Sequence, residues 1–313
     1  MTPSRRQFLA TTSFALAAAL LPLGTLFPAA SAPRRTRLIL LGTKGGPTPA
    51  SRGAPSQVIV IDQVPYVVDC GNGVASRLVA AGLPLDALST VFVTHHHSDH
   101  NADYGNLILL AWASGLNGRV DTYGPPPLAE MTRLFFAMNR YDIETRIADE
   151  GLPELVENVH PHEITTGGLV MEDERVRVTA ALVDHPPVAP AFAYRFDGPD
   201  RSIVISGDTT YSENLVALAR GADVLVHEAM YLPGIDALVR RYPGATRLRE
   251  HLLASHTTTE DVGRVAARAG VETVVLSHLV PGGDASITDA MWVEGVRAHF
   301  DGEIIVGRDL LEI

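Results

Sequence analysis

The sequence contains a single cysteine, Cys70, so an intramolecular disulfide bond is excluded. Lysine is equally rare: 24 of the 25 basic residues are arginine, and Lys44 is the exception. No cluster of basic residues in the body of the chain is large enough for a nucleic-acid footprint, and no repeat of short period is visible. These absences exclude a disulfide scaffold and a repeat architecture, and they argue against a nucleic-acid-binding protein.

The N-terminal region lacks an apolar run long enough to cross a bilayer. A twin-arginine pattern from Ser4 to Leu9 precedes an apolar stretch from Phe14 to Leu21, and Ala30-Ser31-Ala32 fits a small-residue cleavage site. A transmembrane helix needs about 20 apolar residues, so we predict a cleaved twin-arginine export signal over residues 1–32. The mature chain, residues 33–313, would then form one domain without a membrane span, periplasmic or secreted. Its 36 acidic and 23 basic side chains give a net charge of −13.

Apolar residues make up 46% of the sequence, which is ample for a buried core. Short apolar runs between turn-forming residues predict strands at residues 37–41, 56–61, 66–69, 119–123, 169–171, 176–182, 192–196, 202–205, 224–226, 273–276 and 303–306. The last of these is expected to close the domain. Helical periodicity and capping patterns predict helices at residues 74–81, 101–112 and 260–269.

One long segment, residues 128–162, is helical in pattern and contains no cluster of ligand-type side chains. We predict that it is a helical insertion over the functional site, and that residues 231–253 also shape the pocket. His160 and His162 fall in this insertion and are expected to be exposed loop histidines.

The richest stretch of the sequence is Thr94 to His100, between a buried strand and a helix. His95 and His97 are two residues apart, which places both side chains on one side of an extended segment, whereas His96 faces away and is expected to be structural. Asp99 and His100 follow where the chain turns. Imidazole and carboxylate groups suit zinc, with manganese or iron also compatible. The segment offers more ligands than one tetrahedral metal needs, so it favours two adjacent metal ions over a solvated histidine-rich loop.

Further ligand-type residues follow other predicted strands. Five of them lie one to three residues beyond an apolar run of strand length: His95, His185, Asp208, His227 and His278. In layered α/β folds such residues collect at one edge, where loops vary. Asp69 follows another strand, and two roles are open for it: a helix-capping carboxylate, or the partner of a metal-bound histidine.

These motifs together resemble the metallo-β-lactamase superfamily, and most closely its ribonuclease Z and arylsulfatase-like branch. Four other motifs carry the same resemblance: Leu41-Gly42-Thr43, Asp69-Cys70-Gly71-Asn72-Gly73, His227-Glu228-Ala229 and Ser255-His256-Thr257. The resemblance implies an α/β fold, the αββα sandwich of two mixed sheets with outer helices, and a dinuclear site along one edge.

The resemblance also implies the ligands of two divalent metal ions. One ion would be held by His95, His97 and His185, the other by Asp99, His100 and His278, with Asp208 bridging. Two ions about 3.5–4 Å apart can hold one hydroxide between them and lower the pKa of bound water toward about 7.

Three residues are predicted to act in catalysis. Asp99 would accept a proton from the attacking water, and His256 would protonate the leaving oxygen. Glu228 would orient the His256 imidazole and hold it charged. His227 is expected to be structural.

The predicted function is therefore that of a metal-dependent hydrolase of small ester substrates, most of all phosphodiesters. The alternatives are an arylsulfatase, a lactonase or a β-lactamase-type hydrolase and, from another class, a non-catalytic metal-dependent binding protein. A diiron oxygen-using enzyme is disfavoured because no flavin-binding domain is appended. The chain lacks the long arm with which ribonuclease Z grips transfer RNA, so nucleic acid is not expected as substrate. Relatives often pair, which makes a homodimer a further expectation.

Overall fold

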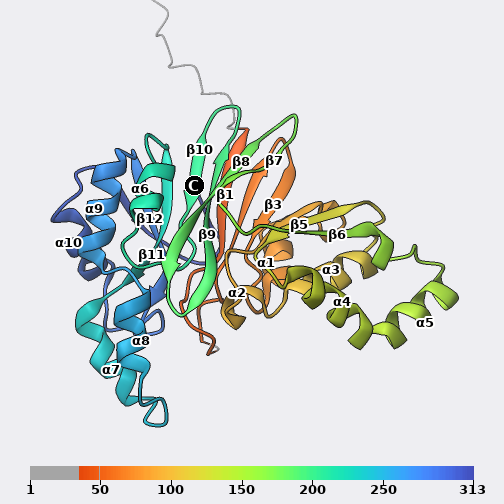
Figure 1. Ribbon diagram of the computed structural model, residues 1–313, viewed down its shortest axis with the longest axis horizontal. Coiled ribbons are helices and arrows are strands. Elements are labelled where there is room, and N and C mark those ends of the chain that lie inside the picture. Colours follow the sequence, from red (N-terminus) through yellow and green to blue (C-terminus); the bar gives the residue numbers. More distant parts are fainter. Residues whose placement is uncertain (1–34, 49) are drawn as a thin grey trace, which may run out of the picture. The chain divides into compact units, whose positions relative to one another are not determined.

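In residues 35–48 and 50–313, which are those that the computed structural model describes, the strands form two mixed seven-stranded sheets (Figure 1). The predicted export signal, residues 1–32, lies outside the described residues. The first sheet has the order β14 (Leu311–Glu312), β1 (Thr36–Gly42), β2 (Ser56–Ile61), β3 (Val64–Val68), β4 (Thr90–Phe92), β5 (Val120–Gly124) and β6 (Val159–Glu163). The second has the order β13 (Glu303–Val306), β12 (Thr273–Val280), β11 (Val224–Met230), β10 (Ser202–Ile205), β9 (Val188–Asp197), β8 (Arg177–His185) and β7 (Gly168–Glu172).

Each sheet combines an antiparallel half with a parallel half. Strands β1 to β3 pair antiparallel and β3 to β6 parallel, while in the second sheet β7 to β10 pair antiparallel and β10 to β13 parallel. The predicted hairpin between β2 and β3 turns at Asp62 and Gln63, whose φ angles of 48° and 70° suit the tight turn that joins adjacent strands.

Successive side chains along each strand point to opposite faces of the sheet, and this alternation divides the core into layers. In β1, Leu38 and Leu40 face the second sheet and enter the apolar cluster between the two sheets. Ile39 and Leu41 point to the other face and pack with the helices that cover it. Because both faces of the central strands are buried, strands such as β2 and β10 are apolar at almost every position.

Helices cover the outer face of each sheet. The first sheet carries α1 (Val74–Ala80), α2 (Ser98–Asn101), α3 (Tyr104–Ala113) and α4 (Leu128–Met138), and the second carries α6 (Glu213–Leu218), α9 (Thr259–Ala269) and α10 (Asp289–Arg297). Figure 1 shows these two helical layers on opposite sides of the paired sheets. The four layers confirm the predicted αββα sandwich of the α/β class.

Three more helices lie outside these layers. Helix α5 (Arg140–Glu150) follows α4, and α7 (Ile235–Arg240) and α8 (Leu248–Ser255) pack on a small separate core. Short 3-10 turns occupy Leu85–Ala87, Val156–Asn158 and Leu232–Gly234. No helix among the described residues is both long and apolar enough to span a membrane.

Some predicted strands are longer in the structure, and three predictions are wrong in the kind, number or order of elements. The segment predicted as helical over residues 128–162 ends in a strand, β6, whose sequence Val-His-Pro-His-Glu has one apolar residue because β6 is an edge strand. A single helix over residues 101–112 is instead the short α2 followed by α3. The strand at 303–306 is not the last, since β14 follows and pairs with β1.

Candidate metal centre

Side chains that follow or end four strands, β4 in the first sheet and β8, β10 and β12 in the second, converge at one place. His95, His97, Asp99 and His100 follow β4, and His185 is the last residue of β8. Asp208 follows β10, and His278 lies near the end of β12. All but His97 are buried.

Three histidines form the first group. His95 Nε2 lies 3.1 Å from His97 Nδ1, and His185 Nε2 lies 3.0 Å from the same atom. Nitrogen ligands about 2.0–2.1 Å from a tetrahedral zinc lie roughly 3.3 Å from one another. With Asp208 these three side chains can therefore surround one metal ion.

The second group consists of Asp99, His100 and His278, and Asp208 lies between the two groups. Asp208 Oδ1 is 3.2 Å from His100 Nε2, and its Oδ2 is 3.1 Å from His278 Nε2. The same Oδ2 is 3.8 Å from the Nε2 atoms of both His95 and His185. The structure thus brings all seven predicted ligands together, and the assignment of each to a metal ion remains a prediction.

Orphaned atoms test whether these residues fit a metal ion. His100 Nε2, Asp208 Oδ1 and His278 Nε2 are buried, and within the described part of the chain they have no hydrogen-bond partner. A buried polar atom without a partner costs about 1–3 kcal/mol. All three are atoms that a metal would bind, so the donor set fits a cation.

Hydrogen bonds to groups outside the ligand cluster determine which ring nitrogen of His185 and of His100 faces the cluster. His185 Nδ1–H donates to the Ser255 carbonyl at 2.9 Å, and His100 Nδ1–H donates to Asp69 Oδ2 at 2.7 Å. Because these oxygens only accept, the Nε2 atoms of both rings present lone pairs to the cluster. Asp69 is therefore the partner of a candidate metal ligand. It does not cap α1, whose N-cap is Gly73 with no side-chain cap.

A bulge in the second sheet positions His278. Ser277 pairs with Glu228 and Leu279 with Ala229, so His278 is left out of the β11–β12 register. Its φ of 41° is unusual for a residue with a side chain, and such bulges re-aim side chains near active sites. The backbone of Gly45 approaches the ring so closely that a Cβ there would lie 2.6 Å from His278 Cε1.

The second group strongly favours positive charge. Burial lowers the pKa of His278, but the carboxylates of Asp208 and Asp99 together outweigh it and raise the pKa to about 10. Burial likewise opposes charge on His100, yet the carboxylates of Asp208 and Asp69 hold its pKa well above the usual range. Protons and metal ions compete for such nitrogens, so metal binding there would release protons.

The histidines of the first group are neutral instead. Burial, with the nearby charge of His100, holds the pKa of His95 well below its usual value. Burial also lowers the pKa of His185 to about 4 against the opposing effect of Asp208. A neutral imidazole is the form that binds a metal.

His256 and Glu228 form a pair next to the cluster. His256 Nδ1 is 3.0 Å from both carboxylate oxygens of Glu228, and Thr209 N–H donates to Oε1 at 2.7 Å. Burial lowers the pKa of His256, but the Glu228 charge and hydrogen bond outweigh it and raise the pKa. Glu228 thus favours the charged form of the ring, which is the form that a proton donor needs. His256 also lies within ligand distance of Asp208 and His278, so the geometry alone does not separate donor from ligand.

Of the remaining histidines, His96 and His227 lie in structural positions as expected, whereas His160 and His162, expected in a loop, both lie on strand β6. Both ring nitrogens of His96 are hydrogen-bonded, to Pro125 O at 2.7 Å and Asn101 Nδ2 at 3.0 Å, which confirms a structural role. His227 is buried within β11 and contacts the Glu228 carbonyl at 2.7 Å. His162 pairs with Asp121 on β5 rather than lying in a loop.

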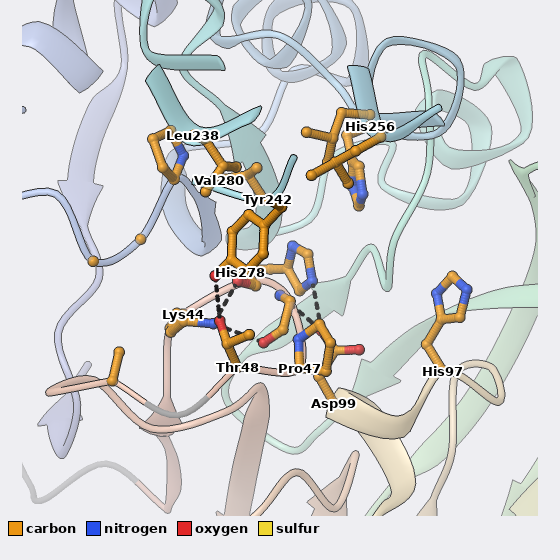
Figure 2. A pocket seen from close by; sticks show the side chains of 18 of the residues that line it. Lys44, Pro47, Thr48, His97, Asp99, Leu238, Tyr242, His256, His278 and Val280 are labelled. Carbon is orange, nitrogen blue, oxygen red and sulfur yellow. Dashed lines mark hydrogen bonds and ion pairs between the residues drawn. The ribbon is translucent and has the colours of Figure 1, made fainter. Parts of the chain in front are cut away.

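A cavity of about 540 Å³ opens beside the cluster (Figure 2). Its lining residues, within the described chain, come from residues 44–48 and Ala50, from the ligand cluster, from α7–α8 and from residues 280–283. Residues 231–253 therefore shape it as predicted. Residues 128–162 do not line it, so the prediction of an insertion over the site is wrong.

Two cavity residues were not predicted from the sequence. Neither Lys44 nor His251 was assigned a role at the site from the sequence, although both line the cavity. The His251 ring centre lies 6.0 Å from those of both His97 and His256. The only feature that could have indicated a role for His251 is its position on α8, whose C-cap is His256; His251 lies one turn before Ser255 on that helix.

Comparisons with known proteins agree with this geometry. A family model described as "Beta-lactamase superfamily domain" matches residues 65–279. The chain belongs to the metallo-β-lactamase superfamily. Within the superfamily it is ribonuclease Z-like: the ribonuclease Z of Mycobacterium sp. (strain KMS) is 37% identical over 276 residues, which cover 87% of this chain and 93% of the relative.

Solved structures of the superfamily share the fold. Human tRNase Z, short form, has a TM-score of 0.65 at 19% identity and covers 88% of this chain and 98% of its own. Zinc-bound PqqB from Methylobacterium extorquens has a TM-score of 0.62 at 15% identity and covers 88% and 99%. The protein is thus a metallo-β-lactamase-fold hydrolase whose histidine and aspartate cluster is able to bind metal ions, in keeping with zinc in a relative of this fold.

Proposed function

We propose that the protein hydrolyses phosphodiesters with two divalent metal ions, zinc in the first instance, held by the seven clustered ligands. The observation that carries this proposal is the convergence of two ligand groups on Asp208 with the charged His256 beside them. The ribonuclease Z relatives support a phosphodiester bond as the one that is cleaved.

When bound, the metal ions would supply Lewis acidity and a water of lowered pKa. Asp99 is placed to accept a proton, because its Oδ2 is fixed by Gly46 N–H at 2.8 Å at the edge of the cavity. His256, which lines the same cavity, would donate a proton to the leaving oxygen while Glu228 keeps its ring oriented.

The test is turnover of bis(p-nitrophenyl) phosphate by metal-loaded protein, with and without a chelator. We expect activity that the chelator abolishes and that zinc restores. A panel of phosphodiesters, aryl sulfates, lactones and β-lactams would identify the preferred ester. No chelator-sensitive activity on any member would overturn the proposal, and two bound ions without hydrolysis would indicate a metal-dependent binding protein.

A second candidate is a ribonuclease, favoured by the 37% identity to the mycobacterial ribonuclease Z. The human relative of the same fold is named as a tRNase. Against this candidate stands the net charge of −11, since phosphate contacts dominate RNA affinity. Cleavage of a transfer RNA transcript at a lower enzyme concentration than the small diester requires would favour the ribonuclease.

We also propose that residues 1–32 are a twin-arginine export signal and that the mature protein acts outside the cytoplasm. The twin arginines and the short apolar stretch support this proposal. N-terminal sequencing of protein recovered from the periplasm should begin near residue 33. An intact Met1 would contradict export with cleavage.

A further inference from the structure

One wall of the cavity is apolar and comes from helices α7 and α8. Leu238, Leu248 and Leu252 line it together with Val280 at the end of β12. These side chains belong to the separate small core under the two helices. Figure 2 shows Leu238 and Val280 across the cavity from Asp99. A group bound next to the metal cluster would therefore touch hydrocarbon on its far side.

The cavity offers little charge for a second phosphate. Its lysine and arginine residues, within the described chain, are Lys44 and Arg241. Lys44 Nζ donates to the carbonyls of Gly45 and Gly46 at 2.9 and 2.7 Å, and Arg241 pairs with Asp284 at 3.1 Å. Both cations are held by protein acceptors, so a ligand with a second phosphate would have to draw one of them away from its present partners.

The size of the cavity suits a small ligand. Cavities for small molecules typically measure about 300–1,000 Å³, and this one measures about 540 Å³. Tyr242 and Thr48 lie across from each other at the cavity, and their hydroxyl groups approach within 3.2 Å. This contact joins the segment between α7 and α8 to the loop that contains Thr48.

We propose that the cavity selects monoanionic phosphodiesters that carry a compact apolar group, alkyl or aryl, which packs against Leu238 and Leu248. This inference rests on the proposed phosphodiesterase function and names its substrate class. Hydrolysis of such a diester adds one water across a P–O bond and yields an alcohol and a phosphomonoester. The charge of the single phosphate is met by the metal cluster, and the apolar group is removed from water by the helical wall.

Two symmetric ligands of equal charge test the inference without depending on the orientation of binding. Dimethyl phosphate and dibutyl phosphate are titrated calorimetrically into zinc-loaded protein. We expect dibutyl phosphate to bind at least about tenfold more tightly, equivalent to about 1.4 kcal/mol. Equal Kd values would overturn the proposal, and so would an RNA oligonucleotide that displaces dibutyl phosphate and is cleaved faster than bis(p-nitrophenyl) phosphate.

A matched pair of variants assigns the effect to the wall. Leu238→Asn with Leu248→Asn should bring the two Kd values to within about threefold. Leu253→Asn, on the same helix α8 but exposed at 38% and outside the cavity lining, should leave the ratio unchanged. An equal loss in the Leu253 variant would contradict the assignment. Zinc content and thermal unfolding verify the fold of each variant. If the double variant does not fold, the comparison of the two dialkyl phosphates on the wild-type protein still tests the inference.

Failure of this inference is distinguishable from failure of the proposed function. If bis(p-nitrophenyl) phosphate is hydrolysed but the two dialkyl phosphates bind equally, the apolar selection is wrong and the function stands. If neither hydrolysis nor binding of any diester is found, the proposed function itself is wrong.

Discussion

The cavity has two walls that differ in their secondary structure and in their side chains: a ligand wall, which carries the candidate metal ligands, and a helical wall. The ligand wall is assembled from strand ends of both sheets, and its side chains are buried and held by outer partners such as Asp69 and the Ser255 carbonyl. The helical wall comes from α7–α8, where Leu238 and Leu248 are partly exposed and where Arg241 and Arg249 pair with nearby carboxylates. Rigid strand ends suit groups that must keep a fixed geometry, whereas helices attached at their ends can vary with the substrate.

This contrast implies a ranking of effects. Changes on the ligand wall should remove metal binding and turnover, because each group needs every one of its members. Changes on the helical wall should alter which ligand binds, and changes outside the cavity should alter neither. The predictions below test this ranking from the largest expected effect to the smallest.

Asp208→Ala should have the largest effect, because Asp208 lies between both ligand groups. We expect loss of at least one metal ion per chain and a fall in kcat/KM of at least about 1,000-fold, more than the 10–100-fold typical of outer partners. Metal analysis and turnover of bis(p-nitrophenyl) phosphate measure both. A variant with two ions and wild-type activity would remove Asp208 from the centre.

His256→Ala should depend on the leaving group. For a diester with a poor alcohol leaving group we expect kcat to fall by about 10²–10⁴-fold, since the proton donor is lost. For p-nitrophenolate, which hardly needs protonation, the fall should be much smaller. Equal losses on both substrates would indicate that His256 acts as a metal ligand or in structure.

Asp69→Asn should weaken metal binding without removing a ligand. The carboxylate accepts from His100 Nδ1 at 2.7 Å, and loss of such an outer partner typically costs 10–100-fold in metal affinity or activity. Competition with a metallochromic chelator gives the affinity. Unchanged affinity in Asp69→Asn would return Asp69 to a purely structural role.

Glu228→Gln should shift the pH profile. The charge and hydrogen bond of Glu228 raise the pKa of His256 against the effect of burial, so its protonated form persists to higher pH and is lost as pH rises through the raised pKa. Without that charge the falling alkaline limb of kcat/KM for a poor leaving group should move to lower pH. An unmoved limb would show that another group donates the proton.

Arg146→Ala, on α5, should have the smallest effect. Its partners Asp142 and Glu150 are on the same exposed helix, and such pairs contribute about 0.3–0.5 kcal/mol. We expect less than about a twofold change in kcat/KM, because α5 does not line the cavity. A larger change would mean that α4–α5 reaches the substrate after all and would weaken the contrast between the two walls.

The sequence predicted the sandwich and the membership of the cluster well. Residues 56–61 and 202–205 are strands with the predicted bounds, because both sheet faces are buried and the apolar runs are unbroken. The polar edge strand β6 was missed for the opposite reason. The predicted ligands are all in the cluster, whereas His227, which also follows an apolar run, is buried inside β11 instead.

Local pattern, then, determined the elements and the chemistry of this protein, because burial and ligand type are properties of individual residues. Tertiary structure alone decided which elements meet. It assigned Asp69 to His100, bulged His278 out of its strand register and placed α7–α8 rather than α4–α5 at the cavity. Such contacts join residues far apart in the chain, and no periodicity within a segment encodes its distant partner.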